Sequence, residues 1–165
     1  DSMIEFITHE NVHSWVHPHA EPYWNEPIAT YVGDLVMGDQ GYPEEAAKRI
    51  ANTIKPALAV DPEMKLYDLN GNGPDSVPKL DPGQQRAVNW GKSFWVFEQL
   101  RKDNPDFLAK YFQAKRKYVP AKLKHGYSLD DAVAIMSIAA GKDLFPWFCE
   151  HGMPVSRDKV QFQTN

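Results

Sequence analysis

The sequence predicts a mainly α protein that folds as one compact helical domain. Apolar residues recur at helical spacing through nearly every segment, and no stretch of any length alternates apolar and polar residues as a half-buried strand does. The length of 165 residues and the hydrophobic content of 42% are sufficient for one hydrophobic core. No internal repeat divides the sequence, so we expect a single domain over residues 1–165.

The first two helices are expected to flank a short loop. One helix should cover residues 3–16, because Pro18 cannot continue it. Residues 17–24, HPHAEPYW, contain two prolines and are interpreted as the loop. The second helix is expected over Glu26–Met37, where Pro27 suits the first turn. The spacing thus predicts a pair of helices within residues 3–37.

Packing helices are expected between about residues 44 and 150. Ser128 and Asp131 form a capping pattern before one of them, and Gly141 is typical of the residue that ends it. The tail over residues 154–165 is expected to add a strand or to fray. The predicted packing helices cover Glu44–Leu58, Pro82–Lys102, Phe107–Lys117, Asp131–Ala140 and a short segment within residues 143–152.

The composition excludes some classes of partner. The formal net charge is −4 and the pI is about 5.8, so the chain lacks the general basic surface of a nucleic-acid-binding protein. No apolar run approaches the ~20 residues of a membrane-spanning helix. Cys149 is the one cysteine, which excludes an internal disulfide, and its aromatic neighbours indicate a buried and inert thiol.

Residues 9–31, HENVHSWVHPHAEPYWNEPIATY, offer more metal ligands than one ion needs. The first five residues form the motif H-E-x-x-H. Residues four apart lie on one face of a helix, so His9 and His13 can bind one zinc ion. Glu10 follows the first ligand and can take a proton from a water that the metal activates. The motif therefore predicts a metallohydrolase with Glu10 as its catalytic base.

Two residues can supply the third ligand. With His19 the spacing matches the metzincin pattern H-E-x-x-H-x-x-G-x-x-H except at Val16, which replaces the glycine. That glycine takes a positive φ, which a β-branched residue adopts poorly. Glu26 is the other possibility, because it opens the next helix and would face the two histidines across an antiparallel helix pair.

The combination of H-E-x-x-H, a short loop and W-N-E-x-x-A-x-Y resembles the gluzincin metallopeptidases over residues 5–37. The resemblance implies a zinc-dependent peptidase in which His9, His13 and Glu26 hold Zn²⁺ and Glu10 activates the water. It implies a protein or peptide as the substrate. It also implies that Ala29 lets the two helices approach closely, and that the chain corresponds to the helical C-terminal half of the catalytic domain.

The resemblance further implies an N-terminal β-subdomain as a partner, because a gluzincin binds the substrate backbone on the edge strand of a sheet. Only eight residues precede His9, so we expect that subdomain to be missing from this chain. Use outside the cell or in the cell envelope is implied in the same way. No motif identifies the residue that stabilises the oxyanion, and the possible donors are Tyr23, Tyr31, Tyr67, His125 and Tyr127.

Other residues of the loop have simpler interpretations. His17 and His19 are expected to be exposed or to line the cleft, and Glu21 is expected on the surface. Asn25 can orient a ligand histidine or cap the second helix.

Two further hypotheses follow from the sequence. Asp68–Asp75 resembles part of a calcium loop, although an Asx-rich turn is the simpler interpretation. A non-catalytic helical module that binds a metal or a protein is the alternative to a peptidase.

Overall fold

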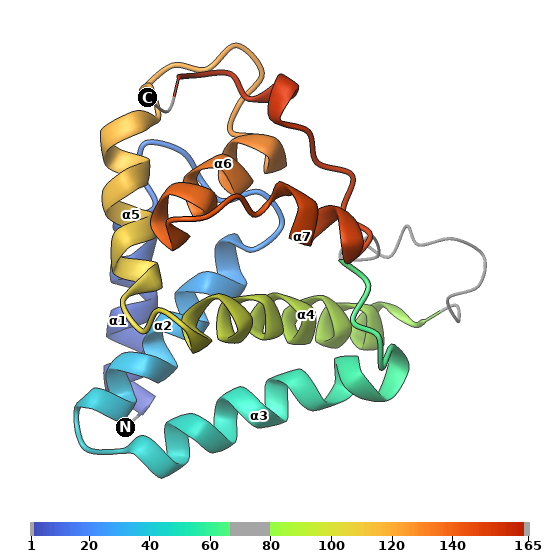
Figure 1. Ribbon diagram of the computed structural model, residues 1–165. Coiled ribbons are helices and arrows are strands. Elements are labelled where there is room, and N and C mark those ends of the chain that lie inside the picture. Colours follow the sequence, from blue (N-terminus) through green and yellow to red (C-terminus); the bar gives the residue numbers. More distant parts are fainter. Residues whose placement is uncertain (1, 67–79, 164–165) are drawn as a thin grey trace.

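The computed structural model describes residues 2–66 and 80–163, and within these ranges it is built from helices (Figure 1). No strand occurs in either range, so the prediction of a mainly α fold is confirmed. The possible calcium loop at Asp68–Asp75 lies outside the described residues. The helices are α1 (Ser2–Trp15), α2 (Asn25–Asp39), α3 (Pro43–Val60), α4 (Pro82–Lys102), α5 (Phe107–Tyr118), α6 (Leu129–Ala140) and α7 (Phe145–Glu150).

The ends of α6 follow the predicted capping chemistry. The Ser128 hydroxyl accepts a hydrogen bond from the backbone N–H of Asp131 at 3.1 Å, and the Asp131 carboxylate accepts one from the N–H of Ser128 at 2.9 Å. Gly141 ends the helix with φ 67°, in the left-handed region. The tail has no strand among its described residues and instead forms one 3₁₀ turn at Arg157–Lys159.

The helices associate mainly as neighbouring pairs. α1 packs on α2, α3 on α4 and α5 on α6, while α2 also contacts α3 and α4. In Figure 1, α4 runs across the middle of the molecule, with α3 below it and α6 and α7 above it. The first helix pair therefore lies against one end of a larger helical body.

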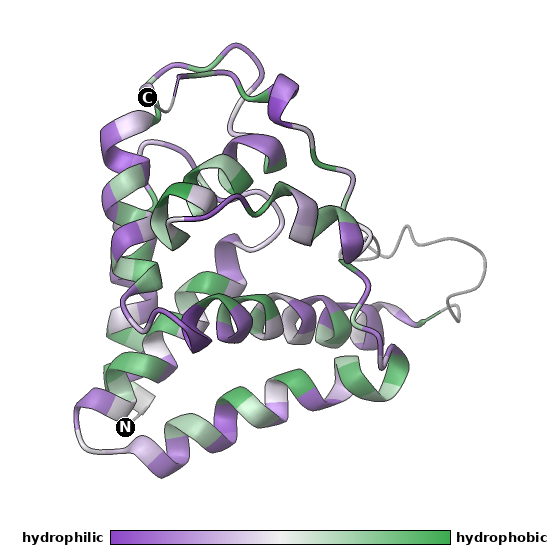
Figure 2. Ribbon diagram, in the orientation of Figure 1, coloured by the Kyte–Doolittle hydropathy of each residue, from purple (hydrophilic) through white to green (hydrophobic). Residues whose placement is uncertain are grey.

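α3 shows how amphipathic spacing places a helix against this body. Its buried residues Ala46, Ile50 and Ala57 recur at helical spacing, while Glu45 and Lys48 on the other side are exposed. Figure 2 shows the resulting alternation of hydrophilic and hydrophobic residues along the helix. Burial of the apolar side therefore fixes which face of α3 meets its neighbours.

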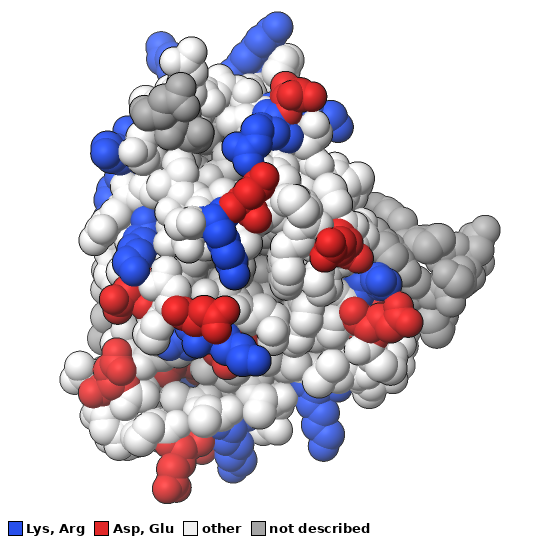
Figure 3. Space-filling view, in the orientation of Figure 1, with Lys and Arg blue, Asp and Glu red and all other residues white. Residues whose placement is uncertain are grey.

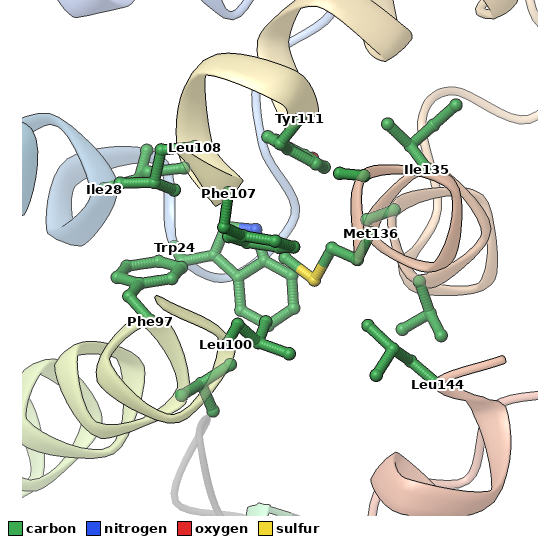
Figure 4. Close-up of a cluster of buried hydrophobic side chains, with 14 of the residues drawn as sticks. Trp24, Ile28, Phe97, Leu100, Phe107, Leu108, Tyr111, Ile135, Met136 and Leu144 are labelled. Carbon is green, nitrogen blue, oxygen red and sulfur yellow. The ribbon is translucent and has the colours of Figure 1, made fainter. Parts of the chain in front are cut away.

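The hydrophobic core gathers around Trp24, which directly precedes α2 and is fully buried. Figure 4 shows its indole between side chains from three other helices, including Phe97 of α4, Phe107 of α5 and Met136 of α6. The ring centroids of Trp24 and Phe97 are 6.2 Å apart in an edge-to-face arrangement. The core therefore anchors the chain at the start of α2.

A close backbone approach brings α1 against α2. A Cβ atom on Gly33 would lie 3.0 Å from the backbone oxygen of Glu5 and 3.2 Å from its Cγ. Ala29, one turn earlier on α2, is completely buried. Small side chains thus line α2 where it faces α1, and Gly33 was not anticipated from the sequence.

An ionic contact ties the same helix pair to α3. Nη1 of Arg49 lies 3.1 Å from Oδ1 of Asp34 and 3.8 Å from Oε2 of Glu5. Burial raises the pKa of the Asp34 carboxyl to about 6, although the hydrogen bond from Arg49 acts in the opposite direction. One arginine of α3 therefore bridges carboxylates of α1 and α2.

Acidic and basic side chains are interspersed over the face drawn in Figure 3. Within residues 2–66 and 80–163, no helix combines the length and the apolar character that crossing a bilayer requires.

The prediction of a buried thiol at Cys149 is wrong, since this residue is exposed. α7 has only six residues and turns Phe145 and Phe148 toward the core, which leaves Cys149 on its outer side. The thiol donates to the backbone oxygen of Val155 at 3.3 Å. The aromatic neighbours in sequence did not show which side of this short helix would be covered.

Replacing Gly33 by valine should destabilise the fold, because two branched methyl groups cannot fit against the backbone of Glu5. We expect the free energy of unfolding to fall by about 1–3 kcal/mol, measured by urea denaturation. The control is Lys48→Val at an exposed position of α3, which carries the helix-propensity cost of valine, about 0.5 kcal/mol, and loses an exposed ion pair with Glu45 that contributes little. Equal losses in both variants would contradict the close approach.

Candidate metal centre

Three side chains that can bind a metal ion, from α1 and α2, lie close together. Nε2 of His9 lies 3.3 Å from Oε2 of Glu26, and Nε2 of His13 lies 3.6 Å from Oε1 of the same carboxylate. The two Nε2 atoms are 3.2 Å apart. Among the described residues this is the group of histidine, cysteine and carboxylate side chains whose spacing suits a metal ion.

The spacing can be compared with the geometry of zinc. With bonds of about 2.0–2.1 Å and tetrahedral angles, two ligand atoms on zinc lie about 3.3–3.4 Å apart. The distances of 3.2, 3.3 and 3.6 Å fall around that value. Each imidazole nitrogen thus lies near one oxygen of the Glu26 carboxylate at about this spacing, and one ligand atom from each of the three side chains lies within 4.8 Å of the others. A zinc ion held by these three side chains would keep a fourth position for a water or a substrate.

Helix geometry explains why these residues meet. His9 and His13 are one turn apart on α1, so their rings project from one side of the helix, with centroids 5.0 Å apart. α2 runs antiparallel to α1, since Gly33 in its second half lies against Glu5 near the start of α1. Glu26 is in the first turn of α2. Its side chain is about half exposed, whereas those of the two histidines are largely covered. The group thus opens to solvent on the side of the carboxylate.

Residues of α2 contact the far sides of the ligands. Nδ1 of His9 forms a hydrogen bond with Oγ1 of Thr30 at 3.0 Å. When Nδ1 carries the hydrogen, Nε2 keeps its lone pair for a metal ion, as in many sites with a partner behind the ligand. Thr30 was not anticipated, although its position four residues after Glu26 places both on one face of α2.

Of the two roles expected for Asn25, capping of the second helix is wrong, and orientation of a ligand histidine stays a prediction. Its Nδ2 lies 3.4 Å from Nδ1 of His13 and donates to Oε1 of Glu26 at 3.4 Å. Its Oδ1 accepts from the backbone N–H of Glu21 at 3.2 Å. α2 begins at Asn25 itself, so this residue does not cap the helix, and Trp24 holds the capping position without a side-chain bond.

Glu10 follows His9 on α1 and is exposed. Its carboxylate makes no hydrogen bond or ion pair with any residue that the structure describes. A carboxylate without such a partner is available to accept a proton. Its role as catalytic base stays a prediction.

His19 lies outside the ligand group. Its Nε2 contacts the backbone oxygen of Pro120 at 2.8 Å, and its ring stacks on Tyr127 with centroids 6.2 Å apart. The alternative in which His19 is the third ligand would require both contacts to break. The structure brings Glu26, and not His19, to the two histidines of the motif.

The expectation that Glu21 lies on the surface is wrong. Its side chain is completely buried and forms an ion pair with Lys115 of α5, which is also completely buried. The hydroxyl of Tyr111 donates to Oε2 of Glu21 at 2.5 Å, and the indole N–H of Trp24 donates to the same oxygen at 3.2 Å. The loop between α1 and α2 is therefore fastened to α5.

Burial also changes the titration of this cluster. It lowers the pKa of the Lys115 ammonium, against the opposing effect of Glu21, and it raises the pKa of Tyr111 well above its ordinary value. Tyr111 and its neighbour Tyr127 are thus held as neutral phenols.

The structure narrows the possible oxyanion donors. Tyr31 is buried and its hydroxyl donates to Glu98, so it points away from the metal ligands. Tyr127 is engaged with Tyr111 at 3.2 Å. Tyr67 lies outside the described residues. Tyr23 is 51% exposed in the loop before α2 and is the donor closest in sequence to the ligands.

No family model, curated protein or solved structure matches this chain.

The ligand spacing predicts about one zinc ion per chain. Loss of a residue that supports a ligand from behind typically weakens metal binding by roughly 10–100-fold. We expect His9→Ala, His13→Ala and Glu26→Ala, which remove a ligand itself, each to weaken zinc binding by more than that. The measurements are metal content by plasma mass spectrometry and a competition titration with a coloured chelator. His19→Ala is the matched control and should keep its zinc. Loss of zinc in His19→Ala with retention in Glu26→Ala would reverse the assignment.

Proposed function

We propose that the protein is a zinc-dependent metallopeptidase, or the helical part of the catalytic domain of one. One observation carries the proposal: one ligand atom from each of His9, His13 and Glu26 lies within 4.8 Å of the others, and Glu10 is next to the first of them in the H-E-x-x-H motif. The resemblance to gluzincins supplies the substrate class, which is a protein or peptide.

In the proposed reaction each residue of the site has a separate role. Zinc held by the three ligands would polarise the scissile carbonyl and lower the pKa of the attacking water. Glu10 accepts the proton of that water and later delivers it to the nitrogen of the leaving amine. Thr30 and Asn25 hold His9 and Glu26 in place from behind.

The proposal includes a partner surface on α1. Met3, Phe6 and Ile7 are 73%, 62% and 52% exposed, and their spacing puts them on one side of the helix. Glu10 continues that side by one turn. In a gluzincin, a β-subdomain packs along the zinc helix and offers its edge strand to the substrate. The apolar side chains on α1 would give such a subdomain a surface beside the catalytic base.

The second function is a non-catalytic module that binds a metal or a protein. The exposed apolar residues of α1 also favour this alternative, because they suit any apolar partner. The two functions differ in whether Glu10 has a chemical task.

Glu10→Gln separates the two functions. Glutamine keeps the shape of the side chain but cannot take a proton, so we expect turnover of a fluorogenic peptide mixture to fall by about 10²–10⁴-fold. Zinc content should remain unchanged. Glu63→Gln, at an exposed position after α3, is the control and should keep full activity. A wild-type protein that binds zinc but cleaves no peptide would favour the module.

The apolar surface has its own test. We expect Phe6→Gln combined with Ile7→Gln to change the free energy of unfolding by less than about 0.5 kcal/mol, since both side chains face solvent. Binding of the hydrophobic dye ANS should decrease in the same variant. A large loss of stability would show that these side chains belong to the core and are not a partner surface.

A further inference from the structure

The zinc ligands Glu26 and His13 come from opposite sides of one short loop, and that loop is fastened to a third helix. The ammonium of Lys115 donates a hydrogen bond to Oε1 of Glu21 and another to the backbone oxygen of His19, at 2.6 Å. It also lies 4.3 Å from the ring centroid of Tyr127. Lys115 therefore contacts the loop at two points.

The Glu21 carboxylate is fully satisfied in this position. Besides Lys115 it accepts hydrogen bonds from the Tyr111 hydroxyl and from the Trp24 indole. A buried ion pair needs such additional bonds to offset the loss of hydration. All the charged atoms of the pair are removed from solvent, so the loop has one well-defined position relative to α5.

The contact chain continues from Glu21 to the metal ligands. The backbone N–H of Glu21 donates to Oδ1 of Asn25 at 3.2 Å, and Nδ2 of Asn25 donates to Oε1 of Glu26 at 3.4 Å. The same amide lies 3.4 Å from the ring of His13. Lys115 is thus linked through two residues to the carboxylate that would complete the zinc site.

We propose that Lys115 is a positioning residue for the metal centre, acting through Glu21 and Asn25 on Glu26. This inference rests on the proposed zinc site. It makes α5 part of the site although α5 supplies no ligand. Removing a residue behind a ligand typically weakens metal binding by about 10–100-fold, and we expect Lys115→Met to have an effect in that range.

The chain offers a matched control for the loss of a buried ammonium. Lys92 of α4 is also completely buried, and its Nζ lies 2.7 Å from Oδ2 of Asp61 at the end of α3. This pair holds α3 and α4 and does not touch the loop between α1 and α2. Lys92→Met should reduce stability while leaving the zinc dissociation constant within about threefold of the wild type. The Asp61 carboxylate otherwise accepts hydrogen bonds from the backbone N–H groups of Glu63 and Lys65, which are far along the chain from the ligands.

The experiment measures the zinc dissociation constant of each variant by chelator competition, at a temperature where circular dichroism shows it folded. The variants are Lys115→Met, Asn25→Ala and their combination. If Lys115 acts through Asn25, the combination binds zinc no more weakly than the weaker single variant. The visible spectra of the Co²⁺-loaded variants should differ from the wild-type spectrum in the same rank order as the zinc dissociation constants. These spectra report the ligand geometry and not the stability.

Two results would overturn the inference: an unchanged zinc affinity in folded Lys115→Met, or losses that simply add in the combined variant. Tyr111→Phe removes one hydrogen bond to Glu21 without leaving an unpaired charge. If Lys115→Met does not fold, this variant tests whether the contacts of Glu21 affect zinc binding. It should weaken zinc binding several-fold. Failure of the wild type itself to bind zinc would instead overturn the proposed function.

Discussion

The buried ion pair between Glu21 and Lys115 is the interaction on which the rest of this structure depends. Two charges without exposure to water are stable only when further donors surround the carboxylate, and Tyr111 and Trp24 provide them. The pair fixes the loop between α1 and α2 against α5. With the loop fastened there, the first turn of α2 lies beside α1, where Glu26 is close to His9 and His13.

Trp24 joins this polar cluster to the hydrophobic core. Its indole N–H contacts Glu21, while its ring packs among aromatic and aliphatic side chains of α4, α5 and α6 (Figure 4). The same few residues thus serve both the packing of the domain and the placement of Glu26. Ligands carried on helices that are anchored in this way keep their spacing, which a metal site requires before the ion arrives.

The proposed peptidase follows from the chemistry at one edge of the molecule. His9, His13 and Glu26 can hold an ion, and Glu10 stands beside them without a partner among the described residues. The described residues contain no strand along which a peptide could align. The exposed apolar side of α1 is the surface on which the proposal places a partner that supplies the substrate-binding edge.

The sequence by itself determined the helices, the capping of α6 and the proximity of His9 to His13, because these depend on local spacing. The role of the ligands stays a prediction. Only the tertiary structure decided that Glu21 is buried, that Thr30 stands behind His9 and that Gly33 lets α1 approach. These features depend on which helix faces which, and Lys115, the partner of Glu21, is 94 residues away. A carboxylate in a loop is usually exposed unless a cation from elsewhere in the fold pairs with it. The residues around Glu21 in the sequence do not show that Lys115 will be that cation.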